Sequence, residues 1–225
     1  MRLCLEYINW TDINLQEEII LLRTLLLSKR IMKNNKQTCS WPKGDPLLTK
    51  YHDTEWGVPL HNDKKLFEFL ILEGFQAGLS WLTILRKRKN FRKAFDKFDF
   101  NKVATYDQLK INSLLQDSGI IRNKLKIESA IINAKAFIEV RKEFKTFNKY
   151  IWKFTGGKPI HNRFDSLKEI PAKTELSDLI SNDLKKRGFK FVGSTIVYAH
   201  MQATGMVNDH IKSCFRYKEI IEKSG

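Results

Sequence analysis

The chain has 225 residues, of which 42% are hydrophobic and 12% aromatic, with 11 Gly and 5 Pro. These values exclude a disordered, collagen-like or repeat-built chain and indicate a globular protein with its own core. Lys and Arg number 40 against 25 Asp and Glu, so the formal net charge is +15. That charge exceeds what solubility requires and predicts a polyanionic partner, a merely lysine-rich soluble surface being the alternative.

The three cysteines, Cys4, Cys39 and Cys214, are odd in number and far apart in the chain. They do not form the pattern of a disulfide framework, which favours a reducing compartment. The apolar run at residues 19–27 is interrupted by Arg23, is shorter than the roughly 18 residues of a membrane span, and lacks the pattern of a secretory signal. We therefore expect a cytoplasmic protein without a membrane partner.

The first 37 residues differ from the rest of the chain. Residues 17–30 have the apolar spacing of an amphipathic helix, and a polar stretch follows at 33–37. This composition predicts an N-terminal extension at 1–37, helical or poorly ordered, a main domain at 38–217 and a short C-terminal tail at 218–225.

The main domain has helical apolar spacing and carries N-capping residues where that spacing begins. The expected helices start at Asp63, Ser80, Asp107, Lys124, Ser177 and Ser194. Gly74 to Gly78 is expected to separate the first two helices, and Gly188 to end the helix that Ser177 opens. Residues 189–198 are rich in β-branched side chains, yet we expect a helix at 194–204 because an isolated strand there would have no partner. The sequence thus predicts an all-α bundle.

Two cysteines each have a histidine nearby, Cys39 with His52 and His210 with Cys214. The His-x3-Cys spacing puts His210 and Cys214 on one face of a helix, and thiolate with imidazole favours zinc. Four protein ligands would complete a tetrahedral shell without an open position, so the ion would be structural and would join the two ends of the domain. Ordinary buried cysteines and histidines are the alternative.

Aromatic residues gather around one carboxylate between residues 41 and 81. Trp41, Tyr51, Trp56 and Trp81 are the aromatics, and Glu73 lies at the end of a strongly apolar helix. Aromatic faces can sandwich a nucleobase, while a carboxylate accepts hydrogen bonds from its amine and attracts a cationic ring. The alternative is that these aromatics are core and that Glu73 caps a helix.

Six blocks of the sequence resemble, in order, the motifs of the DNA-3-methyladenine glycosylase I family, a divergent branch of the helix-hairpin-helix glycosylases. The blocks are CSW at 39–41, YHDTEWGVP at 51–59, LEGFQAGLSW at 72–81, DSGIIR at 117–122, KKRGFKFVG at 185–193 and VNDH at 207–210. The resemblance runs from about Cys39 to Cys214. It implies an all-α helix-hairpin-helix fold with one structural zinc ion.

The resemblance also assigns residues to roles. It implies that Cys39, His52, His210 and Cys214 bind the zinc, and that Glu73 is the catalytic carboxylate that reads the base. Tyr51 and Trp81 would stack on the extruded base with Trp41 and Trp56 nearby. The hairpin would lie at 116–126, where Arg122 and Lys124 meet a phosphate, and Leu79 would be the wedge that fills the gap in the duplex.

The activity implied is hydrolysis of the N-glycosidic bond of 3-methyladenine in alkylated double-stranded DNA by base flipping, in base-excision repair. The family lacks the catalytic Asp of other helix-hairpin-helix glycosylases and has no Lys nucleophile. We therefore expect a monofunctional enzyme, acting as a monomer, that leaves an abasic site.

Three departures from the family pattern keep alternatives open. Leu48 stands where a Tyr is expected, and Asn123 and Leu125 replace a His and a Gly in the hairpin. A catalytically inactive protein that binds damaged DNA is therefore the main alternative, and zinc-dependent hydrolysis would need an open coordination position. Residues 1–31 have no counterpart in the family, and we hypothesise that translation begins at Met32.

Overall fold

The computed structural model describes residues 17–24, 36–42 and 44–224, and the chain divides into two units, Met1–Thr38 and Cys39–Gly225. In the first unit, residues 17–24 form a helix with exposed side chains. This part of the expected helix at 17–30 is confirmed, whereas residues 25–30, Cys4 and Met32 lie outside the described residues. Among the described residues, no helix has both the length and the apolar character needed to cross a membrane.

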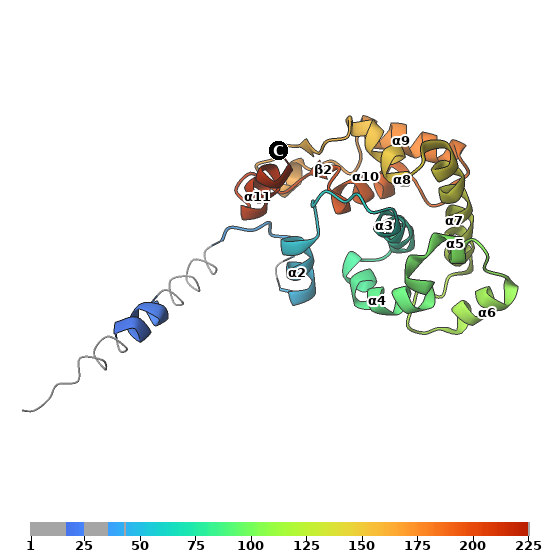
Figure 1. The fold of residues 1–225 in the computed structure, drawn as a ribbon, viewed down its shortest axis with the longest axis horizontal. Coiled ribbons are helices and arrows are strands. Elements are labelled where there is room, and N and C mark those ends of the chain that lie inside the picture. Colours follow the sequence, from blue (N-terminus) through green and yellow to red (C-terminus); the bar gives the residue numbers. More distant parts are fainter. Residues whose placement is uncertain (1–16, 25–35, 43, 225) are drawn as a thin grey trace, which may run out of the picture. The chain divides into compact units, whose positions relative to one another are not determined.

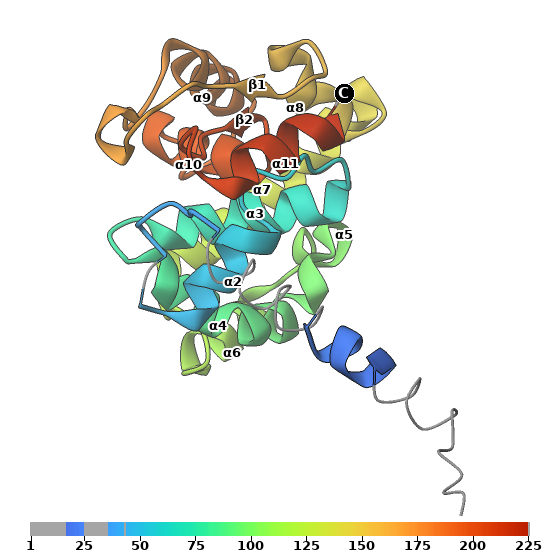
Figure 2. The same cartoon turned by 90° about the vertical axis from the view of Figure 1, so that its left-hand side faces the viewer.

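The second unit is built almost entirely of helices (Figures 1 and 2). Its helices are α2 (Pro46–Thr54), α3 (Asp63–Gln76), α4 (Trp81–Ala94), α5 (Phe100–Val103), α6 (Gln108–Gln116), α7 (Lys124–Phe144), α8 (Phe147–Trp152), α9 (Glu175–Lys186), α10 (Ser194–Ala203) and α11 (Phe215–Ser224). Short 3-10 turns lie at Asp96–Phe98, Lys153–Thr155 and Leu167–Glu169. The all-α prediction is confirmed, with one small addition. Strands β1 (Ile160–His161) and β2 (Val207–Asn208) form a two-residue parallel pair.

Helix α3 is the centre of the second unit. Its residues from Leu66 to Phe75 are all buried, and it packs against α4, α7, α8 and α10. Figure 2 shows α3 between a group made of α8 to α11 and a group made of α2, α4 and α6. The end of α3 therefore lies where both groups can contribute side chains to one site.

Several helix starts are where the capping residues predicted them. The side chains of Ser80, Asp107 and Asn123 accept hydrogen bonds from backbone N–H groups in the first turns of α4, α6 and α7. Helix α7 begins at Lys124 as expected, and α10 confirms the helix expected from residue 194. Gly188, with φ +87°, follows the end of α9 in the left-handed conformation that favours glycine.

Helix α3 begins at Asp63 as expected, but its cap is Asn62 rather than Asp63. The expected start of α9 was wrong, because Thr174 caps this helix, which begins at Glu175, two residues before Ser177. Ser177 instead accepts a hydrogen bond from the Thr174 N–H, completing a capping box. Both errors arise because neighbouring polar residues compete for one cap position.

The break expected at Gly74 to Gly78 is shorter than predicted, because α3 continues to Gln76. A Cβ at Gly74 would lie 3.4 Å from the Cβ of Phe191, so this glycine permits close packing of the loop before α10. The true turn is Ala77–Ser80, which we call the elbow, with Gly78 at φ +77°. At the other end of the chain, α11 continues past residue 217 and buries Ile220 within the predicted tail.

Candidate active site and metal cluster

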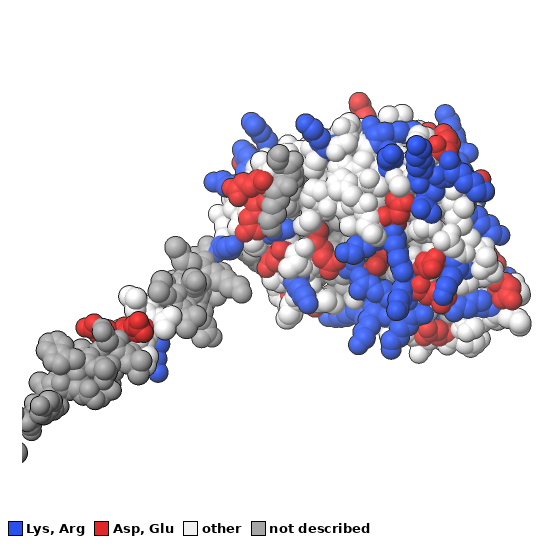
Figure 3. Space-filling model, viewed as in Figure 1, with Lys and Arg blue, Asp and Glu red and all other residues white. Residues whose placement is uncertain are grey.

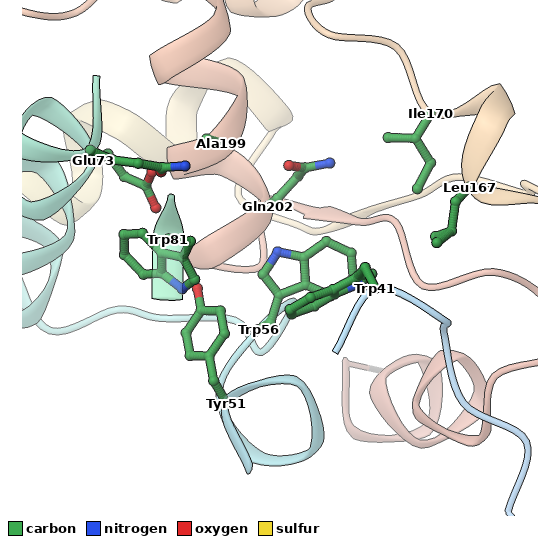
Figure 4. A pocket seen from close by; sticks show the side chains of 10 residues that line it. Trp41, Tyr51, Trp56, Glu73, Trp81, Leu167, Ile170, Ala199 and Gln202 are labelled. Atoms are coloured by element: carbon green, nitrogen blue, oxygen red, sulfur yellow. The ribbon is translucent and has the colours of Figure 1, made fainter. Parts of the chain in front are cut away.

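A pocket of about 350 Å³ opens where the end of α3 meets α2, the start of α4 and α10 (Figure 4). It is lined by Trp41, Tyr51, Trp56, Glu73, Gln76, Trp81, Leu167, Ile170, Ala199 and Gln202. The structure thus brings together all five residues predicted for a base pocket. The sequence reasoning missed the other five lining residues, which come from α3, α10 and the 3-10 turn at 167–169 with the residue after it.

The aromatic rings form two walls of the pocket. Tyr51 and Trp81 have ring centroids 5.4 Å apart, and the Tyr51 hydroxyl points toward the Trp81 indole (Figure 4). Trp41 meets Trp56 edge to face at 5.2 Å. Phe69 stacks on Trp81 at 6.4 Å, and Tyr51 and Trp56 are almost fully buried. These rings pack against one another and line the apolar side of the pocket.

Among the residues that the structure describes, Glu73 is the one carboxyl group that lines this pocket, and it is almost fully buried, with a relative exposure of 3%. Burial raises the pKa of Glu73 from 4.5 to about 8. The buried guanidinium group of Arg88 is bound by two other carboxylates, because it donates at 2.6 Å to both Glu55 and Glu68. Within the described residues, no cation forms an ion pair with Glu73. A cationic ligand entering the pocket would therefore favour the ionised carboxylate.

Gln202 presents a second polar group to the pocket. Its Nε2 donates to Asp209 Oδ2 at 2.8 Å, and Asp209 also accepts from Tyr198 and Asn162, each at 2.6 Å. Three donors around one carboxylate identify it as an acceptor, which fixes the orientation of the Gln202 amide. Its amide oxygen faces the side of the pocket that holds Glu73 and Trp81 (Figure 4).

The elbow beside the pocket holds the predicted wedge. Leu79 lies at the tip of the elbow and is 40% exposed. A hollow of about 190 Å³ lies between the elbow and the start of α10, and it shares Glu73, Gln76 and Ala199 with the pocket. This hollow connects the surface at Leu79 with the buried carboxyl group.

The predicted hairpin is the turn at residues 117–123 between α6 and α7. Arg122 and Lys124 are both exposed there. Asp117 Oδ1 accepts from the Gly119 N–H at 2.7 Å, and Lys87 Nζ from α4 donates to the Ser118 carbonyl at 2.8 Å. The turn is thus held against α4 while its cations face solvent.

Cys39, His52, His210 and Cys214 form a buried cluster whose ligand atoms all lie within 4.8 Å of one another. His52 Nδ1 lies 2.7 Å from Asp53 Oδ1, and His210 Nε2 lies 3.1 Å from the Trp56 carbonyl oxygen. Each ring donates its N–H to that acceptor, so the other nitrogen faces the cluster as a lone pair. These two nitrogens are only 3.1 Å apart.

The two cysteine sulfurs lie 3.5 to 3.7 Å from these nitrogens, so two imidazole lone pairs and two thiol groups face one another. The cluster is therefore a donor set that fits a metal ion. It joins the segment before α2 and α2 itself to the turn before α11, as the sequence predicted for the four residues.

Comparison with known proteins places this geometry in a family. The family model described as methyladenine glycosylase matches residues 41–217. This chain belongs to the methyladenine glycosylase family. It is 48% identical to DNA-3-methyladenine glycosylase 1 of Escherichia coli K12 over 181 residues, covering 80% of this chain and 97% of that protein. It is 46% identical to DNA-3-methyladenine glycosylase of Haemophilus influenzae over 176 residues, covering 78% and 95%.

Solved structures of the methyladenine glycosylase family have the same fold. A crystal structure of 3-methyladenine DNA glycosylase I superposes with a TM-score of 0.78 at 48% identity, over 80% of this chain and 98% of that one. A variant of 3-methyladenine DNA glycosylase I in complex with 3-methyladenine superposes at 0.77 with 32% identity, over 79% and 96%. The expected family and the expected fold are thus confirmed.

The departures from the family pattern have defined places. Leu48, on α2, packs against the aromatic cluster of Tyr51 and Trp56 and does not line the pocket. Asn123 caps α7 by accepting from the Lys126 N–H at 3.1 Å, and Leu125 is 68% exposed. The hairpin of this methyladenine glycosylase therefore has a regular helix start despite both replacements.

Proposed function

We propose that this protein hydrolyses the N-glycosidic bond of 3-methyladenine in alkylated double-stranded DNA and leaves an abasic site, as a step of base-excision repair. The observation that carries the proposal is a buried, unpaired carboxyl group in an aromatic pocket of a methyladenine glycosylase family member. The names of its relatives state the same substrate.

The reaction needs no strong acid. Methylation at N3 gives the base a positive charge, so when the C1′–N bond breaks the base takes both electrons and leaves neutral. Water adds to C1′ and releases one proton. The protein's task is to rotate the nucleotide out of the stack, at a cost of about a few kcal/mol, and to hold it for this attack. None of the described residues that line the pocket is a lysine, which supports hydrolysis without strand cleavage.

The pocket residues account for selectivity in this proposal. Tyr51 and Trp81 stack on the base and gain most from an electron-poor ring. Glu73 accepts a hydrogen bond from the exocyclic amine, and a positive base stabilises its ionised form in the low dielectric of the pocket. A neutral purine offers no such compensation, so it would leave the carboxyl group protonated. Trp41 and Trp56 complete the apolar wall.

Contacts with the duplex are assigned to the exposed side. Arg122 and Lys124 would bind phosphates, and Leu79 would occupy the space that the extruded base leaves. We propose that the protein acts as a monomer. We also propose a cytoplasmic location, which the free thiols of Cys39 and Cys214 support.

We propose zinc as the ion of the cluster, held by Cys39, His52, His210 and Cys214. Four protein ligands fill a tetrahedral shell, so this ion would stabilise the fold and take no part in hydrolysis. The cluster supports the pocket directly, because the His210 ring that faces it also donates to the backbone of Trp56.

The proposal is tested by incubating the protein with methylated duplex DNA and separating released bases by chromatography. Wild type is expected to release 3-methyladenine, and Glu73→Ala to release it at least tenfold more slowly with little change in affinity for undamaged duplex. Gln108→Ala, at an exposed position of α6, is the control variant. No release by folded wild type would favour the inactive, damage-binding protein, and normal release by Glu73→Ala would refute the role of this carboxyl group.

A further inference from the structure

Lys126 is a buried lysine, with a relative exposure of 8%, in the first turn of α7. Its Nζ donates to the Phe75 carbonyl at 2.9 Å and to the Ala77 carbonyl at 2.6 Å. Both carbonyls belong to the end of α3 and the elbow, about 50 residues earlier in the chain. The ammonium group therefore joins α7 to the point where α3 ends.

The end of α3 requires such a partner. The last carbonyls of a helix have no intrahelical donor and form the negative end of its dipole. Helix α3 has no basic residue in its own last turn. A buried ammonium group is costly unless it is hydrogen-bonded, and burial lowers the pKa of Lys126. The lysine and the helix end thus satisfy one another.

Lys126 connects two regions that the proposed function uses together. On one side it lies two residues after Lys124, and its own N–H is bound by Asn123, which caps the hairpin helix. On the other side it holds Phe75 and Ala77, between Glu73 in the pocket and Leu79 at the tip of the elbow. One side chain thus links the start of the hairpin helix directly to the segment between Glu73 and Leu79.

We propose that Lys126 is a positioning residue that fixes the elbow to the DNA-binding hairpin, so that Leu79 enters the duplex and Glu73 meets the extruded base when the hairpin holds the backbone. This inference rests on the proposed function. Lys126 touches neither base nor phosphate, and it acts through the backbone of Phe75 and Ala77. Displacement of reacting groups by about 1 Å can cost about 100-fold in rate, so loss of this contact is expected to affect extrusion and excision.

The test replaces Lys126 by Met, which keeps the length of the side chain and removes the three donors. We expect single-turnover excision of 3-methyladenine to slow at least tenfold. Extrusion of the base should slow in parallel, as measured with a fluorescent base analogue placed beside the lesion. Affinity for undamaged duplex and for free 3-methyladenine should stay within about twofold of wild type, because hairpin and pocket are intact. Lys126→Gln retains an N–H donor and should excise the base at a rate between those of wild type and Lys126→Met. It also takes the place of Lys126→Met if that variant does not fold.

Arg141→Met is the matched control. Arg141 also lies on α7 and also joins it to α3, but at the opposite end, through Asp63 at 2.8 Å. The Arg141→Met substitution should lower thermal stability. It should not slow extrusion at a temperature where both this variant and Lys126→Met are folded. Excision by Lys126→Met at the wild-type rate, or an equal loss in both variants, would overturn the inference. Absence of excision by wild type would instead overturn the proposed function on which it rests.

Discussion

Glu73 is an acidic side chain that is deeply buried. Its burial makes the free energy of unfolding depend on pH. Its pKa in the folded protein, about 8, lies above the ordinary value of 4.5, so the folded chain holds this proton more tightly than the unfolded chain. The stabilising effect is complete below pH 4.5 and is lost as the pH rises through 8. At pH 8 and above, the folded protein contains a buried carboxylate that no cation compensates.

We therefore expect Glu73→Gln to be more stable than wild type at alkaline pH. The difference in free energy of unfolding should be small near pH 4.5, grow through pH 8 and reach about 1 kcal/mol or more. Urea titrations across this pH range measure it. A difference that does not change with pH would show that Glu73 is not protonated in the folded enzyme. The same variant should lose excision activity, because the carboxylate is the group that a cationic base requires.

His200 is a second buried titratable group. It lies in α10 among Leu70, Phe147 and Val197, and within the described residues neither of its ring nitrogens has a hydrogen-bond partner. Burial lowers its pKa to about 4. The unfolded chain therefore binds this proton more tightly, and stability is lost as the pH falls from about 6.5 toward 4.

Replacing His200 by Leu removes an unsatisfied polar group from an apolar cavity. We expect the free energy of unfolding at pH 7 to rise by about 1–3 kcal/mol and its decrease below pH 6.5 to become shallower. Thermal unfolding at pH 5 and pH 7 checks both effects. A lower stability of the Leu variant at both pH values would indicate that the imidazole has a partner in solution.

The residues of the pocket show how far sequence reasoning reaches. Glu73, Tyr51 and Trp81 lie in dense, recognisable motifs, and the structure brings them together. Gln202 could not be found in this way, because its importance depends on Asp209, which orients the amide only after folding. Leu167 and Ile170 lie in a stretch without regular spacing. Sequence identifies the residues that a motif marks, and misses those that become neighbours by packing.

At the scale of elements, Asp63 connects helices that are far apart in sequence. It is the first residue of α3, but its carboxylate accepts from the N–H groups of Phe147 and Asn148 at the start of α8, at 3.1 and 2.9 Å, and from Arg141 at 2.8 Å. One side chain therefore supplies a cap, a charge at the positive end of a helix dipole and an ion pair.

Asp63→Ala should destabilise the protein by about 2 kcal/mol, near the upper end for a cap, because the donors of α8 lose their partner inside the fold. Asp107→Ala is the comparison, since Asp107 caps only its own exposed helix through the Lys110 N–H at 2.8 Å, and should cost about 1 kcal/mol. Urea denaturation gives both values. Equal losses would show that the contact between α3 and α8 adds nothing to an ordinary cap.

The contacts of Asp63 explain which parts of the fold could be predicted from the sequence. Helices were expected where apolar spacing and caps coincide, and α7 was found to begin at Lys124 as expected. The choice between Asn62 and Asp63 depends on a partner 84 residues away, Phe147, and no local pattern contains it. The pairing of β1 with β2 could not be predicted for the same reason, because two residues carry too little strand propensity to be recognised without their partner.

At the scale of the whole molecule, the metal cluster joins the beginning and the end of the second unit. Cys39 precedes α2 and His52 lies within it, whereas His210 and Cys214 precede α11. Removing the proposed zinc ion should leave the two histidine nitrogens that face the cluster without a common partner, and α2 with Tyr51 would lose its attachment to the C-terminal turn.

We expect a strong chelator to lower the melting temperature and to reduce excision, and added zinc to restore both. Cobalt(II) should restore them equally well, because four protein ligands would leave no open position on the proposed ion for hydrolysis. Calorimetry and base release on the same samples provide the measurement. Full stability but no activity after metal removal would contradict a structural role.

The net charge of +15 is not distributed evenly. Lys and Arg side chains gather over the region of α4 and α5 (Figure 3), where Lys64, Lys89, Arg92, Lys93, Lys97 and Lys102 surround a groove with Asp96 and Asp99. Lys89 and Lys93 form no ion pair with another described residue. They lie in the last two turns of α4, about 12 and 18 Å along the helix from the pocket at Trp81. The hairpin that carries Arg122 and Lys124 contacts α4 through Lys87 and Asn90 instead, at Ser118 and Gly119.

These two pairs of cations separate the effect of position from the effect of total charge. If Arg122 and Lys124 bind phosphates, replacing both by Gln should reduce the slope of log affinity against log salt by about 2 and weaken alkylated and undamaged duplex equally. Lys89→Gln with Lys93→Gln removes the same charge and should change the slope by less than about 0.5, because a phosphate that is not contacted releases no counterion. Titrations of a short duplex at several salt concentrations compare them. An equal loss in both double variants would mean that DNA responds to the overall field of the protein, and the hairpin would then have no special part in binding.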